Sequence, residues 1–190
     1  MSLTVLKEFP KEVRLSSDNL EASIRPLAPG DAAELLAFFL RIPEEDRFFL
    51  KEDVTSPEVT STWAEEIDYD RVVPLVGLVD GEIVADATLH RHRAGARRHI
   101  GEIRVVVDPR YRNMGLGTLM IREVVDIAYD NAMDGVIFEL VKGKEDNAIA
   151  LVKSLGFQEL TSLPSFVKDL EGQPHDLVLL QLSLDEWLER

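Results

Sequence analysis

The feature that most constrains the fold is an alternation of strand and helix patterns in the second half of the chain. A strand is predicted over His99–Asp108, and an amphipathic helix follows from about Gly115 to Asn131. A buried strand over Gly135–Val141 comes next, and then a helix over Asn147–Leu155 that Gly156 closes as a C-cap. This order predicts an α/β fold in which the two strands run parallel and the long helix connects them.

The rest of the chain predicts further elements around the same sheet. The expected strands are Lys11–Leu15, Glu21–Leu27, the hairpin strands Val72–Val79 and Glu82–His90 around an Asp80-Gly81 turn, a strand from Phe157, and Leu177–Leu182. The other expected elements are a turn at Ser16–Asn19, a helix capped by Asp31 and ended by Pro43, a helix from Ser56 through Ile67, a turn at Glu171–Pro174 and a short terminal helix at Leu184–Arg190. We therefore expect a mixed α/β fold with one central mixed β-sheet of about six or seven strands and helices on both faces.

Size and composition fit a single domain over residues 1–190, of which 45% are hydrophobic and 29% charged. The sequence contains no cysteine, which excludes disulfides, thiolate metal sites and a cysteine nucleophile. Because no signal peptide or long apolar span is apparent, we expect a cytoplasmic protein without a membrane partner. The formal net charge of −14 repels phosphate backbones, so a nucleic-acid partner is not expected.

The chemically informative segment is the loop between the strand that ends at Asp108 and the helix that begins at Gly115. Glycine allows a ligand to approach the backbone, and the free N–H groups of a first helical turn attract anions such as a pyrophosphate. Arg110 and Arg112 add positive charge. Met120 breaks the dinucleotide pattern G-x-G-x-x-G, and no Gly-Lys-Ser/Thr triplet of a P-loop occurs.

The pattern Arg112-x-x-Gly115-x-Gly117 after a strand resembles motif A of the GNAT superfamily of acyl-CoA-dependent N-acetyltransferases. The segment Asn147–Phe157, which ends in Leu-Gly-Phe, looks like motif B of that superfamily, and Ile24–Leu27 followed by a helix is similar to its opening elements. The resemblance covers about residues 21–182 and extends more loosely to bacterial protein-lysine acetyltransferase domains. It leaves a short N-terminal strand and a C-terminal helix as appendages.

The resemblance implies a GNAT-like fold and a reaction that transfers an acetyl group from acetyl-CoA to an amine acceptor, with no metal. In that family the strand before the loop pairs with the pantetheine arm, and the loop amides hold the pyrophosphate. The matching pantetheine positions here are Val105, Val106 and Val107. The matching pyrophosphate positions are Arg112, Asn113, Met114, Gly115, Leu116, Gly117 and Thr118.

Glu102 is the candidate catalytic residue. It lies on the strand that leads into the motif, on the same strand face as Arg104, Val106 and Asp108. Its position resembles that of the general-base glutamate in related acetyltransferases. Without a cysteine to carry an acyl group, transfer is expected to be direct, with a backbone N–H near Val106 stabilising the developing oxyanion.

One family position departs from the usual pattern. Many members place a tyrosine in the motif B helix to protonate the leaving thiolate, and Val152 stands there in this chain. Tyr129 and Ser154 are the conceivable substitutes. His90 and His92 could share a strand face and bind a metal, but a solvated basic loop is the favoured interpretation because no acidic partner is nearby.

Several functional questions stay open at this level. The acceptor is a protein lysine, an N-terminus, a polyamine, an amino acid or an antibiotic amine, and a homodimer is conceivable. A non-catalytic acyl-CoA-binding sensor is the alternative to an enzyme, and a plain protein-interaction domain is a third possibility. Affinity for acetyl-CoA and turnover against a panel of amines distinguish the three.

Overall fold

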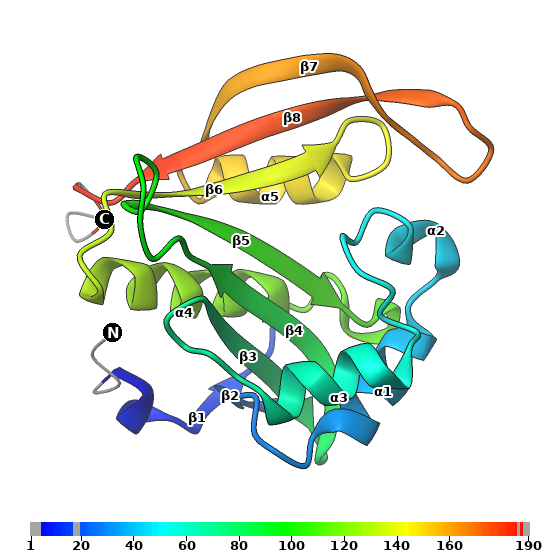
Figure 1. The fold of residues 1–190 in the computed structure, drawn as a ribbon. Helices are drawn as coiled ribbons and strands as arrows, with labels where there is room; N and C mark the ends of the chain where they lie inside the picture. Colours follow the sequence, from blue (N-terminus) through cyan, green and yellow to red (C-terminus); the bar gives the residue numbers. More distant parts are fainter. Residues whose placement is uncertain (1–4, 17–19, 186, 188–190) are drawn as a thin grey trace.

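The computed structural model describes residues 5–16, 20–185 and 187, and these residues are organised around one eight-stranded sheet (Figure 1). The strands are β1 (Lys11–Arg14), β2 (Glu21–Pro26), β3 (Val72–Val79), β4 (Glu82–His90), β5 (Ile100–Val107), β6 (Gly135–Val141), β7 (Gln158–Lys168) and β8 (Pro174–Ser183). The helices are α1 (Ala32–Arg41), α2 (Glu44–Arg47), α3 (Pro57–Glu65), α4 (Leu116–Asp130) and α5 (Asp146–Ser154), with 3₁₀ turns at Val5–Glu8 and Pro109–Tyr111.

The sheet has the strand order β1-β2-β3-β4-β5-β6-β8-β7. Neighbouring strands are antiparallel except β5 and β6, which are parallel. Helix α4 connects these two strands, as the sequence predicts.

Helices cover both faces of the sheet, because the strands carry apolar side chains on both sides. On one face, α1 and α3 pack against Val76 of β3, and Phe38 and Phe39 of α1 are almost completely buried there. On the other face, α4 lies across β3 to β6 and buries Leu116, Met120 and neighbouring side chains. Val152 of α5 joins this second cluster.

The parallel strands β5 and β6 stay paired for only a short distance. Their register runs from Ile100 opposite Gly135 to Glu102 opposite Ile137 and then stops. Figure 1 shows the two strands diverging beyond this point, with α2 near the end of β5. From Ile103 onward, β5 is therefore paired with β4 on one side and leaves its other edge open.

The predicted fold class is confirmed, with helices on both faces of a mixed sheet. Seven of the eight strands lie within residues 21–183, one residue beyond the predicted limit, and the short β1 is the eighth. Asp31 precedes α1 as expected, but its carboxylate binds Arg25 and the Ala28 N–H instead of a helix amide. The expected turn at 16–19 and the terminal helix at 184–190 include residues 17–19, 186 and 188–190, which lie outside the described residues.

Candidate active site at the splayed strands

The loop after β5 leads directly into the start of α4. Gly115 is the N-cap of this helix and has a left-handed backbone, with φ at 86°. The Leu119 N–H donates to the Gly115 carbonyl at 3.1 Å, which leaves the amides of 116–118 without an acceptor inside the helix. These amides and the positive end of the helix dipole form an anion-binding feature beside the open edge of β5.

The two glycines of the motif have different structural roles. Gly115 adopts a conformation that costs an L-residue about 1–2 kcal/mol, so the local fold explains its identity. Gly117 has no positive φ, and a Cβ added there would meet only Val107 Cγ2 at an ordinary 3.6 Å. Glycine in a helix also destabilises it relative to alanine. The fold therefore does not require Gly117, and its lack of a side chain favours close approach of a ligand to this turn.

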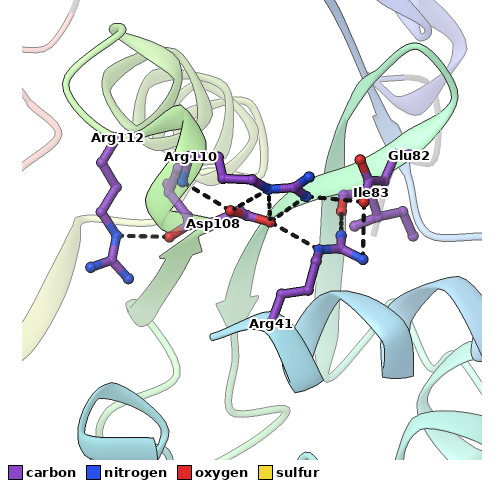
Figure 2. A network of polar contacts seen from close by, with 7 residues as sticks. Arg41, Glu82, Ile83, Asp108, Arg110 and Arg112 are labelled. Carbon is purple, nitrogen blue, oxygen red and sulfur yellow. Dashed lines mark hydrogen bonds and ion pairs between the residues drawn. The ribbon is translucent and has the colours of Figure 1, made fainter. Parts of the chain in front are cut away.

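A buried carboxylate fixes the end of β5 (Figure 2). The Asp108 side chain is 1% exposed and accepts hydrogen bonds from Arg41 Nε at 2.9 Å and Arg110 Nη2 at 2.8 Å. Burial alone would raise the pKa of Asp108, but the bonds from Arg110 and Arg41 outweigh burial and hold this pKa at about 2. Arg41 also donates to the Ile83 carbonyl at 2.6 Å, so the network ties α1 and β4 to the start of the loop.

Arg112 lies at the loop, where its guanidinium pairs with a carboxylate of α2. Its Nε donates to the Val107 carbonyl at 2.9 Å (Figure 2). Its Nη2 donates to the Asp46 carboxylate at 2.7 Å, and both side chains are 40% exposed. Arg110 is directed instead to Asp108 and Glu82. Of the two arginines expected beside the anion, the structure thus leaves Arg112 in an exposed, exchangeable pair.

The open edge of β5 presents backbone groups in a defined alternation. The Asp108 N–H donates to Val84 on β4 at 2.9 Å, so the amide of Val106 also points toward β4. The N–H and carbonyl groups of Val105 and Val107 therefore face the open edge. The Val107 carbonyl already accepts a hydrogen bond from Arg112. Of the backbone N–H groups next to Val106, those of Val105 and Val107 therefore face the open edge, and that of Val106 does not.

Glu102 lies where β5 and β6 part and is held by two cations. Its Oε1 accepts from Lys51 Nζ at 2.7 Å and from Arg104 Nε at 2.8 Å. Lys51 Nζ also donates to Glu139 Oε2 on β6 at 2.9 Å, so its ammonium bridges the two strands. Burial would raise the pKa of Glu102, but the hydrogen bonds from Lys51 and Arg104 outweigh it and lower this pKa.

A second carboxyl group on the same face of the sheet was not predicted from the sequence. Asp86 of β4 stands between Val76 and Val106 in the register, and its residue is 7% exposed. Burial raises the pKa of Asp86 to about 7. Its alternation with Ala85 and Ala87 could have placed it on the face of Glu102, but nothing in the sequence indicates how deeply it is buried.

Three further candidates, His90, Val152 and Ser154, have contacts that explain them structurally. His90 is opposite Glu102 in the register, and its Nε2 lies 3.0 Å from Thr88 Oγ1; burial lowers its pKa to about 4. Val152 is 1% exposed in the core, and the Ser154 hydroxyl donates to the Leu151 carbonyl at 2.6 Å.

In the described ranges, we find no group of three or more side chains arranged to hold a metal ion. Within these same ranges, no helix is long and apolar enough to cross a membrane.

Comparison with known proteins relates these features to enzymes. The profile of the Acetyltransferase (GNAT) family matches residues 36–157. The L-amino acid N-acetyltransferase AaaT of Escherichia coli (strain K12) is 28% identical over 98 residues, which are 50% of this chain and 60% of that protein. The GNAT domain of S. lividans PAT superposes with a TM-score of 0.75 at 19% identity, covering 92% of this chain and 96% of that one. YncA, described as a putative acetyltransferase from Salmonella typhimurium with its cofactor acetyl-CoA, gives a TM-score of 0.73 at 20% identity over 87% of this chain and 95% of that one.

Proposed function

The chain belongs to the GNAT acetyltransferase family, and from this premise we propose that it is an N-acetyltransferase that moves an acetyl group from acetyl-CoA directly to an amine acceptor. The observation that carries the proposal is the open edge of β5 between the helix-start amides and Glu102. This edge joins an anion site to a carboxylate that can accept a proton. The E. coli relative supports the proposal, although the chain covers only 60% of its length.

Acetyl-CoA fits the residues along the open edge of β5. The amides of 116–118 and the Arg112 guanidinium would hold the pyrophosphate, with Gly117 allowing close approach. The open carbonyl of Val105 can accept a hydrogen bond from an amide of the pantetheine arm, as one strand pairs with another. When bound, acetyl-CoA supplies a thioester whose carbonyl carbon is open to attack by an amine.

The reaction needs two contributions from this chain, a proton acceptor and a donor to the developing oxyanion. An aliphatic amine has a pKa of about 10.4, so it arrives as an ammonium and must lose a proton before it attacks. We assign the proton acceptor to Glu102, acting directly or through one water. The Val105 N–H would donate to the carbonyl oxygen as negative charge develops there. The thiolate can leave without a dedicated acid, because a thiol pKa is near 8.5.

The test of the proposed base is Glu102→Gln, which keeps the side-chain shape and removes the proton acceptor. We expect kcat at neutral pH to fall roughly 10²- to 10⁴-fold with the best amine, while acetyl-CoA affinity stays near wild type. Stopped-time assays with an amine panel across a pH series, paired with calorimetry, measure both quantities. A kcat within a few-fold of wild type would contradict the assignment, and Asp86 would then be the next carboxyl to substitute.

The alternative of a non-catalytic acyl-CoA sensor makes a different prediction in the same assay. A sensor binds acetyl-CoA and leaves the thioester intact with every amine in the panel. The relative from E. coli, named as an L-amino acid N-acetyltransferase, favours the enzyme. Binding without turnover across the full panel would overturn the enzyme proposal.

The proposal also covers the amine acceptor, the cellular location and the oligomeric state of the protein. The relative from E. coli is named for L-amino acids, so free amino acids should be included in the panel with peptides that contain lysine. We place the reaction in the cytoplasm. We also keep a homodimer as a prediction, supported by the edge strand β7, on which Leu160 and Phe166 are 54% and 65% exposed.

A further inference from the structure

Lys51 places a primary amine at the point where β5 and β6 separate. It follows α2 in the chain, and its Nζ lies 2.7 Å from Glu102 Oε1 on β5 and 2.9 Å from Glu139 Oε2 on β6. The two strands stop pairing at Glu102 and Ile137, so the ammonium bridges the strands just where they part. An internal amine thus occupies a carboxylate pair that could receive the amine of an external acceptor.

The direction of the open edge brings the acyl end of the cofactor toward this amine. The helix-start amides of 116–118 lie beyond Val107, and from there the open edge runs back through Val105 toward Glu102. The distance along the strand from Val105 to Glu102 is about 10 Å at about 3.3 Å per residue. A pantetheine arm anchored at the loop therefore points its thioester toward the position of the Lys51 ammonium.

We propose that Lys51 is an acetyl acceptor of its own chain, a modification that rests on the proposed acetyltransferase function. Glu102 takes a proton from the Lys51 ammonium, and the free Nζ attacks the carbonyl carbon of the thioester. The new C–N bond forms as the C–S bond breaks, and the electron pair of that bond leaves on the sulfur of CoA. The second amine proton passes to solvent or to the thiolate, so the products are acetyl-lysine and CoA.

The modification would change the site in a defined way. Acetyl-lysine carries no charge, so Glu102 and Glu139 would lose the cation that they share. Loss of a neighbouring positive charge raises the pKa of a carboxyl group, which makes Glu102 a stronger base. The carboxylate pair would then be available to an external ammonium.

A matched lysine elsewhere in the chain separates this proposal from a surface ion pair. Lys153 is 46% exposed at its side chain, against 44% for Lys51, and its Nζ also lies 2.7 Å from one carboxylate, that of Glu159. Lys153 is on α5, which packs through Val152 in the cluster on the α4 face of the sheet, whereas Glu102 shares the strand face of Val106, on the side of α1. Acetyl-CoA modifies exposed lysines slowly without an enzyme, and Lys153 reports that background rate in the same tube.

The experiment is peptide mass spectrometry of the full chain during incubation with isotope-labelled acetyl-CoA. We expect Lys51 to be labelled at least tenfold faster than Lys153, with a first-order rate that does not change with protein concentration. Glu102→Gln should slow labelling of Lys51 at least tenfold and leave Lys153 unchanged, with circular dichroism as the check on folding. Gly117→Trp, which obstructs the proposed cofactor turn, should bring Lys51 down to the rate of Lys153.

The opposing outcomes are equally specific. Equal rates at Lys51 and Lys153, or a Lys51 rate that Glu102→Gln does not change, would overturn the proposal. A rate that rises with protein concentration would overturn transfer within one chain. The amine panel is run on the same preparation: turnover of free amines without labelling of Lys51 refutes this inference alone, whereas neither turnover nor labelling refutes the proposed function too.

Discussion

At the scale of single residues, the two glycines at the start of α4 separate what the fold needs from what a ligand needs. Gly115→Ala should cost about 1–2 kcal/mol of stability, because its φ of 86° lies in the left-handed region. Gly117→Ala should leave stability unchanged or slightly higher, because its added Cβ meets only an ordinary contact. Gly117→Trp should abolish measurable acetyl-CoA binding while the fold persists. Urea unfolding and calorimetry measure these effects.

Gly117→Ala is the control for Gly117→Trp, because both remove the glycine and only tryptophan fills the space beside the helix-start amides. We expect the affinity for acetyl-CoA to fall with side-chain volume at this position. An unchanged affinity in Gly117→Trp would place the pyrophosphate elsewhere.

At the scale of elements, α2 carries an anion that competes with the proposed ligand. Asp46 pairs with Arg112 at 2.7 Å, and an exposed pair of this kind contributes about 0.2–1 kcal/mol. Asp46→Asn should therefore tighten acetyl-CoA binding by about 1.5- to 5-fold, because the guanidinium no longer has to leave a carboxylate. The control is Glu45→Gln, which removes the same charge from the exposed neighbouring residue of α2. If calorimetry shows equal effects for the two variants, Asp46 acts only through the net charge of the surface, and the prediction of competition for Arg112 is wrong.

The elements also show which parts of the molecule could be predicted from the sequence. The hairpin of β3 and β4 has the predicted bounds, because Asp80 and Gly81 supply a turn with positive φ at both positions. The loop before α4 was predictable for the same reason, since its glycines and strand are local signals. Lys51 was not, because it lies in an acidic segment without periodicity, and its contacts to Glu102 and Glu139 join residues 51 and 88 positions apart.

At the scale of the whole molecule, two buried carboxyl groups give the stability of the protein opposite dependences on pH. Asp108 has a folded pKa of about 2, below its usual 3.8, so its contribution is present above pH 4 and is lost as the pH falls toward 2. Asp86 has a folded pKa of about 7, above the same reference, so the folded state keeps a proton that the unfolded state has released. Asp86 alone therefore makes stability fall as the pH rises from about 4 to about 7, whereas His90, whose folded pKa of about 4 lies below its usual 6.5, makes stability rise over nearly the same range.

The contribution of Asp86 is the sharper prediction, because one substitution removes it and leaves the titration of His90 in place. A shift of the Asp86 pKa from 3.8 to about 7 corresponds to at most about 4 kcal/mol of stability lost between these pH values. Asp86→Asn has the same shape and no titration, so its change in stability from pH 4.5 to pH 8 should be more favourable than that of wild type by up to that amount. Asp108→Asn is the matched control, and it should flatten only the acidic side. If urea unfolding gives Asp86→Asn the same change in stability as wild type between pH 4.5 and pH 8, Asp86 ionises freely in the folded protein and is not buried as described.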